Sequence, residues 1–273
     1  MKVSLVVQSA EDVPTAPLAL LSGGFEDKVR KAAAAGADGL ELMVVYPDNL
    51  DAALVKAQVE AHGLSVSAIS SGAVRTTTGL SLLHRDSEKA SLAMARLIEL
   101  IRFAGRVEAP FVTIGSFRGI GSWVEGDARR SLRDILRDAA SSAESNGVRL
   151  VIEPLNRYET DLINTAREGL DLIEEIGHPA VGLLLDTFHM NIEEVGMIGP
   201  FSEAMAGGRL WHIHVADNNR LSPGSGCLDF GMITHHLQKI GYQGFLSGEM
   251  VPRPDPDSAA ALTVKYLKGL GGP

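Results

Sequence analysis

The sequence is almost without cysteine, and this excludes two means of stabilisation. Cys227 is the only cysteine among 273 residues, so the chain cannot form an internal disulfide bond. It also cannot assemble a cluster of thiolates around zinc. Because free thiols persist in reducing compartments, we predict a cytoplasmic protein.

Long apolar runs and an excess of positive charge are absent too. No stretch of about 18 uninterrupted apolar residues occurs, and the N-terminal segment turns acidic before the apolar part of a secretory signal is complete. The 34 acidic residues outnumber the 25 Lys and Arg, which gives a formal net charge of -9. Negative charge repels a phosphate backbone. We therefore expect neither nucleic acid nor a membrane as a partner.

The chain does contain a regular alternation of short apolar runs and longer amphipathic stretches. The longer stretches, such as 86–105 and 125–147, begin with acidic residues and end at glycine, as helices do. Such repeated βα units predict a single (β/α)8 TIM-barrel domain over residues 1–273, with a doubly wound open sheet as the alternative. The predicted strands are 3–7, 39–44, 64–69, 111–114, 148–152, 181–185, 210–215 and 244–247.

Polar side chains that can bind a metal follow or line the last four predicted strands. Glu153 and Asp186 come directly after apolar runs, and Glu249 follows "GFLSG". His212 and His214 alternate in "LWHIHV" and so face one side of their strand. The carboxyl ends of barrel strands carry the chemistry of this fold. Carboxylates gathered there repel one another, and a divalent cation such as Mn²⁺, Mg²⁺, Co²⁺ or Fe²⁺ would neutralise them.

Several motifs resemble those of the D-tagatose 3-epimerase family of xylose isomerase-like TIM barrels. They are "VIEPLNRYETDLINT", "LLLDTFHMNIEE", "HIHVADNNRLSPGSG" and "GEMVP", and the likeness is most specific between Val151 and Arg220. "GLSLLHRD" and "VTIGSFRG" add a resemblance to the 5-keto-L-gluconate epimerases. The resemblance implies a metal-dependent epimerase of carbohydrate metabolism that acts on a free ketose or keto-hexonate.

The resemblance also implies roles for single residues. It makes four residues the ligands of one divalent metal, usually Mn²⁺: Glu153, Asp186, His214 and Glu249. The two glutamates of this set would also be the catalytic acid/base pair. Three further residues would bind the sugar or sugar acid: Glu159, His189 and Arg220. Cys227 departs from the pattern, because close relatives often have histidine there. We further expect a homo-oligomer, either a dimer or a tetramer.

The chemistry can be reasoned from the residue types as well. A carbon next to a ketone loses its proton more easily when a metal binds the ketone oxygen and stabilises the resulting cis-enediolate. Inverting that carbon requires one base on each face of the planar enediolate, and Glu153 and Glu249 lie on different strands that can supply them. An aldose–ketose isomerase would move one proton on one face. Two facing carboxylates therefore favour an epimerase.

Other functions share parts of this pattern. A barrel isomerase or dehydratase, similar to hydroxypyruvate isomerase or inosose dehydratase, could use the same metal ligands. An apurinic endonuclease has a similar barrel but needs three metals, more histidines and a basic surface. A sugar-binding barrel without activity would have no need of Glu153 and Glu249.

The loops indicate which kind of sugar would bind. The loop "MVPRPDPDSAA" after the last strand has no glycine, three prolines without an N–H donor and two aspartates, so it is a poor phosphate site. We therefore predict an unphosphorylated substrate. Arg118, in "GSFRG", is the candidate to pair with a substrate carboxylate; the alternative is an Arg bound to a neighbouring acidic side chain. The roles of His84, Trp123 and Cys227 stay open.

Overall fold

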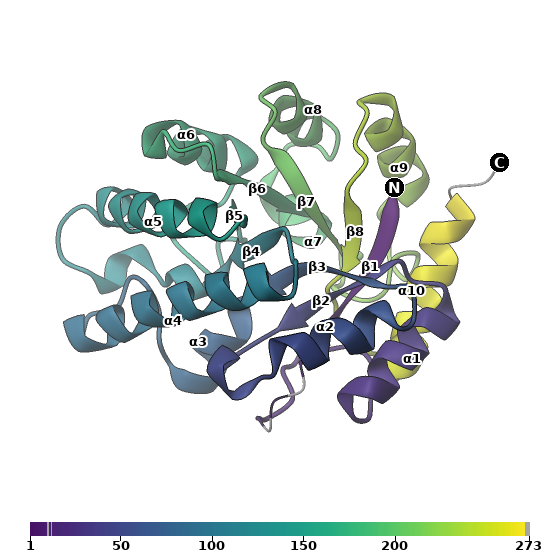
Figure 1. Ribbon diagram of the computed structural model, residues 1–273. Coiled ribbons are helices and arrows are strands. Elements are labelled where there is room, and N and C mark those ends of the chain that lie inside the picture. The colour runs from purple at the N-terminus through teal and green to yellow at the C-terminus, as the bar shows by residue number, and fades with distance from the viewer. Residues whose placement is uncertain (10, 12, 271–273) are drawn as a thin grey trace.

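The computed structural model describes residues 1–9, 11 and 13–270, and in it all eight predicted strands are present. Each strand pairs in parallel with the next along the chain, and β1 pairs with β8 to close the barrel (Figure 1). The (β/α)8 prediction is thus confirmed, and the open sheet is wrong because an open sheet has unpaired edges. The strands are β1 Lys2–Gln8, β2 Gly39–Met43, β3 Ser65–Ser70, β4 Phe111–Ile114, β5 Arg149–Ile152, β6 Val181–Asp186, β7 Leu210–Val215 and β8 Phe245–Gly248.

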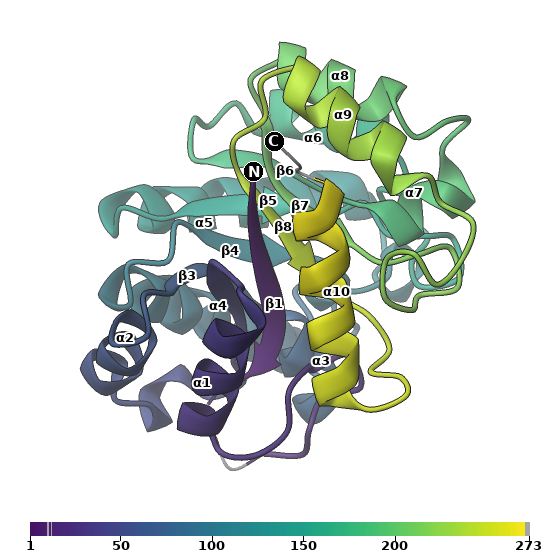
Figure 2. The same ribbon diagram turned by 90° about the vertical axis from the view of Figure 1, so that its right-hand side faces the viewer.

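Helices surround the barrel and connect its strands (Figures 1 and 2). Several begin at an aspartate or threonine whose side chain accepts backbone N–H groups of the first turn, as for α4 and α6. Two short helices, α3 and α7, are additional to the βα repeat and start where β3 and β6 end. The helices are α1 Phe25–Ala35, α2 Ala52–Glu60, α3 Gly72–Thr78, α4 Ser87–Arg106, α5 Ala128–Ser145, α6 Ala166–Ile176, α7 Thr187–Glu193, α8 Gly199–Ala206, α9 Phe230–Lys239 and α10 Pro256–Leu270. Short 3-10 turns are η1 Pro47–Asn49, η2 Ser116–Arg118 and η3 Gly121–Trp123.

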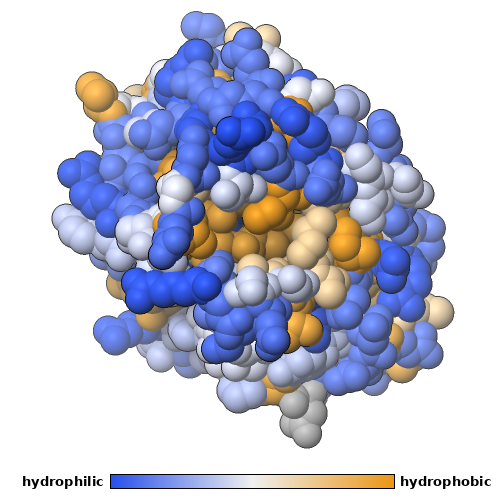
Figure 3. Space-filling model, turned by 90° about the vertical axis from the view of Figure 1, so that its left-hand side faces the viewer, coloured by the Kyte–Doolittle hydropathy of each residue, from blue (hydrophilic) through white to orange (hydrophobic). Residues whose placement is uncertain are grey.

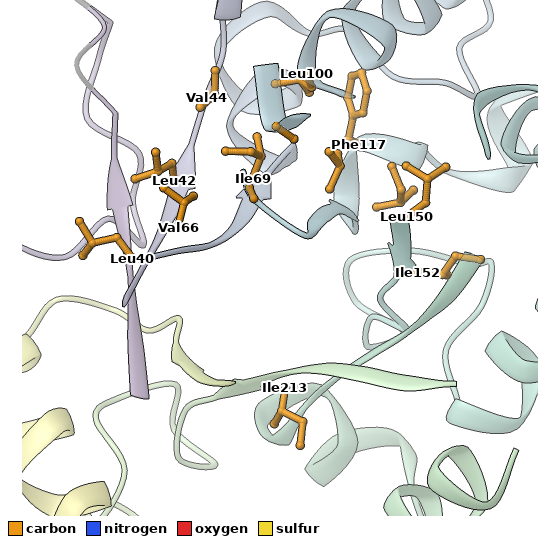
Figure 4. Close-up of a cluster of buried hydrophobic side chains, with 14 of the residues drawn as sticks. Leu40, Leu42, Val44, Val66, Ile69, Leu100, Phe117, Leu150, Ile152 and Ile213 are labelled. Carbon is orange, nitrogen blue, oxygen red and sulfur yellow. The ribbon is translucent and has the colours of Figure 1, made fainter. Parts of the chain in front are cut away.

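The hydrophobic core lies mainly between the strands and the helices. Figure 4 shows Ile152 and Ile213 pointing away from the space that the strands enclose, while Leu100 of α4 approaches from outside. Side chains alternate along a strand, so the neighbours of Ile213, namely His212 and His214, face the inside of the barrel. Along β7 the alternation therefore places Ile213 outward and the two titratable histidines inward.

A membrane-spanning helix is not found in the described part of the chain, where no helix is both long and apolar enough to be one.

Candidate active site

A cavity of about 260 Å³ opens at the carboxyl ends of the strands. Helices α4 and α5 begin on the left of Figure 1, and the face seen from that side is hollowed, with hydrophobic surface inside and hydrophilic surface around it (Figure 3). Part of the wall is apolar, including Leu18, Met43 and Leu155. The polar wall includes Glu153 and Glu249. This cavity has the position at which TIM barrels carry out their chemistry.

The structure brings the four predicted metal ligands together. One ligand atom from each of Glu153, Asp186, His214 and Glu249 lies within 4.8 Å of the others, and all four residues are buried. His214 Nδ1 is 3.1 Å from Glu153 Oε1 and 3.6 Å from Glu249 Oε2. Gly115 allows this arrangement, because a Cβ atom at that position would come within 2.3 Å of Glu153 Oε2.

The donor set fits a divalent cation. Asp186 caps α7 by accepting the N–H of Phe188 through Oδ1 at 2.8 Å, which is the structural role a lone aspartate at a strand end usually has. Its Oδ2 is buried and has no hydrogen-bond partner among the residues that the structure describes. A buried carboxylate oxygen without a partner is costly. Three carboxylates and one imidazole nitrogen suit Mn²⁺ or Mg²⁺ better than a soft metal.

The surroundings shift the pKa values of these carboxyl groups in different directions. Burial, reinforced by the charge of Glu153, raises the pKa of Asp186 to about 7. Burial also raises the pKa of Glu153. Burial acts the same way on Glu249, but His214 and Arg220 outweigh it and lower the pKa of Glu249. Two carboxyls whose pKa values are pushed apart are typical of an acid and a base that work together.

The shift at Asp186 predicts a pH dependence of stability. Because its folded pKa, about 7, lies above the ordinary aspartate value of 3.8, Asp186 stabilises the metal-free fold fully below about pH 4 and loses that contribution as the pH rises through 7. A cation that replaces the proton should stabilise more at higher pH. We expect the rise in Tm caused by Mn²⁺ to be larger at about pH 8 than at about pH 5.5, measured by differential scanning calorimetry. Asp186→Asn, which keeps the helix cap, should lose most of this rise; an equal rise at both pH values would contradict the prediction.

Glu159 and Arg220, two of the three residues to which the family resemblance gives a role in substrate binding, pair with each other at the cavity. Arg220 Nη1 donates to Glu159 Oε1 at 2.8 Å, and Arg220 Nη2 lies 3.6 Å from Glu249 Oε2. The guanidinium also lies over the ring of Phe188, 4.8 Å from its centre. The Arg220 backbone has a φ of 58°, an uncommon conformation for a residue with a side chain. These contacts aim the guanidinium into the cavity and hold it there.

His189, the third residue that the resemblance implies in substrate binding, is arranged as a neutral hydrogen-bond donor. Its Nδ1 accepts the backbone N–H of Asn156 at 3.2 Å, so the proton of the neutral ring is on Nε2. Burial, together with the charge of Arg220, keeps the pKa of His189 well below its usual value. Nε2 is buried, lies 3.7 Å from Asp186 Oδ2 and makes no hydrogen bond in the described part of the chain. It can therefore donate to a hydroxyl or carbonyl oxygen of a ligand.

Arg118 does not reach the cavity, and the prediction that it pairs with a substrate carboxylate is wrong. Its side chain is 0% exposed. All five of its N–H groups donate to backbone carbonyl oxygens, those of Gly115, Glu153, Leu162 and Ile163, at 2.8 to 3.2 Å. Burial lowers its pKa to about 10, so it stays charged at neutral pH. Arg118 joins the loops after β4 and β5 instead of binding a ligand, and its partners are carbonyls, not the acidic side chain of the alternative interpretation.

A buried acidic residue that contacts His214 was not anticipated from the sequence. Glu41, in the middle of β2, lies against His212 and His214 inside the barrel. Burial would raise the pKa of Glu41, but its contacts with the two histidines lower it well below its usual range. The sequence did contain a signal that could have revealed Glu41: a charged residue between two leucines in a predicted buried strand.

Three residues whose roles were open lie at the edge of the site or outside it. Trp123 contacts the guanidinium of Arg75 on its ring, 5.1 Å from the centre, and the His84 ring at 6.5 Å. Neither Trp123 nor His84 lines the cavity that contains Glu153 and Glu249. Cys227 is exposed, and its backbone N–H donates to Asn218 Oδ1 at 2.9 Å. Cys227 is thus part of a loop and not of the metal-ligand cluster.

Comparison with known proteins assigns the fold to a family. The model of the xylose isomerase-like TIM barrel matches residues 29–270. The chain belongs to this family. An L-ribulose 3-epimerase of Methylomonas sp. (strain DH-1) is 30% identical over 234 residues, which cover 84% of this chain and 79% of that protein.

Other members of the family match over different lengths. A D-psicose 3-epimerase of Enterocloster bolteae is 45% identical over 120 residues, but these cover only 44% of this chain and 39% of that protein. The apo crystal structure of a 3-keto-D-glucoside 4-epimerase from E. coli has a TM-score of 0.81 at 25% identity, covering 98% of this chain and 100% of the other. The relatives thus include epimerases named for two different carbon atoms of the sugar.

Proposed function

We propose that this protein is a divalent-metal-dependent carbohydrate epimerase that inverts a carbon next to the ketone of a free sugar. The observation that carries the proposal is the cluster of Glu153, Asp186, His214 and Glu249 at the cavity. Family members named ketose 3-epimerase and keto-sugar 4-epimerase support the same reaction type. A related isomerase or dehydratase could hold the same metal, and the stereochemistry of the product distinguishes it.

The proposed roles follow from position. Glu153, Asp186, His214 and Glu249 would hold the cation. Their oxygen-rich set favours Mn²⁺, with Mg²⁺, Co²⁺ or Fe²⁺ as alternatives. When bound, the cation supplies positive charge that makes a proton next to a ketone more acidic. Glu153 follows β5 and Glu249 follows β8, with two strands between them around the barrel. From these places the two carboxyls can remove and return a proton on opposite faces of the sugar.

The charges of the cavity favour a neutral ketose over a keto-hexonate such as 5-keto-L-gluconate. Arg118 and the resemblance to the 5-keto-L-gluconate epimerases both favoured a substrate with a carboxylate, but the donors of Arg118 are all used by backbone carbonyls. Arg220 already faces the carboxylates of Glu159 and Glu249. A further carboxylate would lack an unengaged cationic side chain among the described residues that line the cavity, and its desolvation would be poorly compensated.

The proposal can be tested by product analysis. Neutral ketoses, keto-hexonates and ketose phosphates are incubated with the enzyme and Mn²⁺ in D₂O, and NMR follows deuterium incorporation and the configuration of the product. We expect exchange and inversion at a single carbon of a neutral ketose, with a lower kcat/KM for the acid and the phosphate. No exchange into any of these sugars would refute the epimerase, whereas aldose formation or loss of water would identify an isomerase or a dehydratase.

Substrate binding should depend on His189 and Arg220. A hydrogen bond from the charged Arg220 to a neutral sugar is worth about 1.5–3 kcal/mol and one from the neutral His189 about 0.5–1.5 kcal/mol, and each is lost in the corresponding alanine variant. We expect KM to rise about tenfold or more in Arg220→Ala and about threefold to tenfold in His189→Ala, with a smaller effect on kcat. Steady-state kinetics on the ketose found above would measure this. A variant with wild-type KM and strongly reduced kcat would show that the residue acts in proton transfer instead.

The predictions of a cytoplasmic location, a homo-oligomer and a single domain over residues 1–273 belong to this proposal and are supported by composition and family resemblance alone.

A further inference from the structure

Glu41 is a fully buried carboxylate close to the proposed metal site but outside the cavity. It lies in β2 with 0% exposure. Met43, two residues further along the same face of the strand, lines the cavity, whereas Glu41 does not. Glu41 therefore lies one layer deeper in the barrel, where a substrate cannot touch it. A buried carboxylate at such a depth requires compensating donors.

Three side chains from two other strands supply those donors. Glu41 Oε2 is 2.8 Å from His212 Nε2 and accepts from Ser247 Oγ at 2.9 Å. Both carboxylate oxygens of Glu41 lie 3.0 Å from His214 Nε2. The carboxylate of β2 thus reaches across the barrel to β7 and β8.

The contact with Glu41 determines which nitrogen of His214 is left for a metal. A carboxylate only accepts hydrogen bonds, so the nitrogen that faces it, Nε2, carries a proton. Nδ1 faces Glu153 and Glu249, and a cation bound among these carboxylates would replace the proton there, so that the lone pair of the ring is on Nδ1. Nδ1 is the atom that lies 3.1 Å from Glu153 and 3.6 Å from Glu249. The ring is therefore oriented, and its tautomer selected, for coordination through Nδ1.

We propose that Glu41 is the positioning residue of the metal centre: its carboxylate holds the proton of His214 on Nε2 and turns Nδ1 toward the cation. This inference rests on the proposed metal site. Carboxylates that orient a metal-bound histidine in this way commonly contribute 10- to 100-fold to metal affinity. The competing explanation is that Glu41 only satisfies buried donors, in which case its loss would reduce stability and leave metal affinity unchanged.

The test is the affinity of the purified enzyme for Mn²⁺. Glu41→Gln keeps the shape of the side chain, but its amide nitrogen can face His214 Nε2 as a donor and favour the wrong tautomer. We expect the Kd for Mn²⁺, measured by equilibrium dialysis with EPR detection of free Mn²⁺, to rise about 10- to 100-fold. Ser247→Ala is the matched control, because it removes a hydrogen bond from the same carboxylate and leaves His214 in place. Its Kd should stay within about twofold of wild type.

A second measurement on the wild-type enzyme keeps the inference testable if Glu41→Gln fails to fold. In ¹⁵N-histidine-labelled protein loaded with ¹¹³Cd²⁺, we expect metal–nitrogen coupling at Nδ1 of His214 and a proton on Nε2. Coupling at Nε2 would overturn the inference, and so would Glu41→Gln enzyme with wild-type Kd. Either of these two results would leave the proposed epimerase intact. Wild-type enzyme that binds neither Mn²⁺ nor Cd²⁺ would instead overturn the proposed metal site, and the inference with it.

Discussion

Glu153→Gln and Glu249→Gln are each expected to lower turnover by about 10²- to 10⁴-fold, the usual contribution of a general acid or base. Each glutamate is buried at the cavity and lies next to His214, so each would act both as a ligand and as a group that moves a proton. Glutamine preserves the size of the side chain and one oxygen donor. It cannot accept the proton, and inversion requires a working base on both faces of the sugar.

The measurement is the epimerisation rate under single-turnover conditions, together with the bound Mn²⁺ content of each variant. Glu175→Gln is a suitable control, because Glu175 pairs with Arg129 on the outside of the barrel. A metal-loaded Glu153→Gln or Glu249→Gln enzyme with near-normal turnover would exclude the two-base mechanism. Exchange of solvent deuterium without inversion in one variant would identify which glutamate acts on which face.

Arg118→Ala is expected to lower the free energy of unfolding by about 3 to 5 kcal/mol, a large effect for a single substitution. The substitution leaves a cavity and removes five hydrogen bonds with a charged donor, each worth about 1.5–3 kcal/mol. The carbonyls of Gly115, Leu162 and Ile163 keep one other donor each, which lowers the cost. Because the loops can relax in part, the loss of stability should be smaller than the sum of the separate costs of the cavity and the lost hydrogen bonds. Since Arg118 Nη1 binds the carbonyl oxygen of Glu153 at 2.8 Å, the loop that carries a proposed catalytic residue should loosen as well.

Urea unfolding followed by circular dichroism would measure this loss. Arg30→Ala removes an exposed Arg that pairs with Asp27 at the surface, and its effect should stay within about 0.5 kcal/mol. The loss of stability in Arg118→Lys should lie between those of Arg118→Ala and Arg30→Ala, because an ammonium group has three donors where the guanidinium has five. If Arg118→Ala were as stable as Arg30→Ala, the guanidinium would not be holding the loops together.

The strands and most of the site could be predicted because their signals are local. The run "VGLLLD" is apolar to its last residue, and an aspartate directly after a buried parallel strand must emerge at the carboxyl end of the barrel. The same logic placed Glu153 and Glu249, and the alternation of "HIHV" placed both histidines on one side of their strand. Backbone periodicity determines these positions, whatever the rest of the chain does.

Arg118 shows where such reasoning fails. Its position after β4 was predicted correctly, but position alone does not reveal the direction of a long side chain. The carbonyls of Leu162 and Ile163, 44 and 45 residues further along the chain, take up its donors. A flexible side chain bonds to whatever acceptors the fold brings near, and these acceptors are backbone atoms that carry no sequence signature.

By itself, the sequence determined the barrel, the rim that carries the chemistry and the side chains gathered there, because strand periodicity and strand order are properties of neighbouring residues. Only the tertiary structure decided that Nδ1 of His214 faces Glu153 and Glu249 and that Glu41, 173 residues away, contacts Nε2. It also decided that Arg220, and not Arg118, is the arginine at the cavity. Hydrogen bonds between residues on distant strands depend on the register and closure of the barrel, and these arise only when all eight strands are in place.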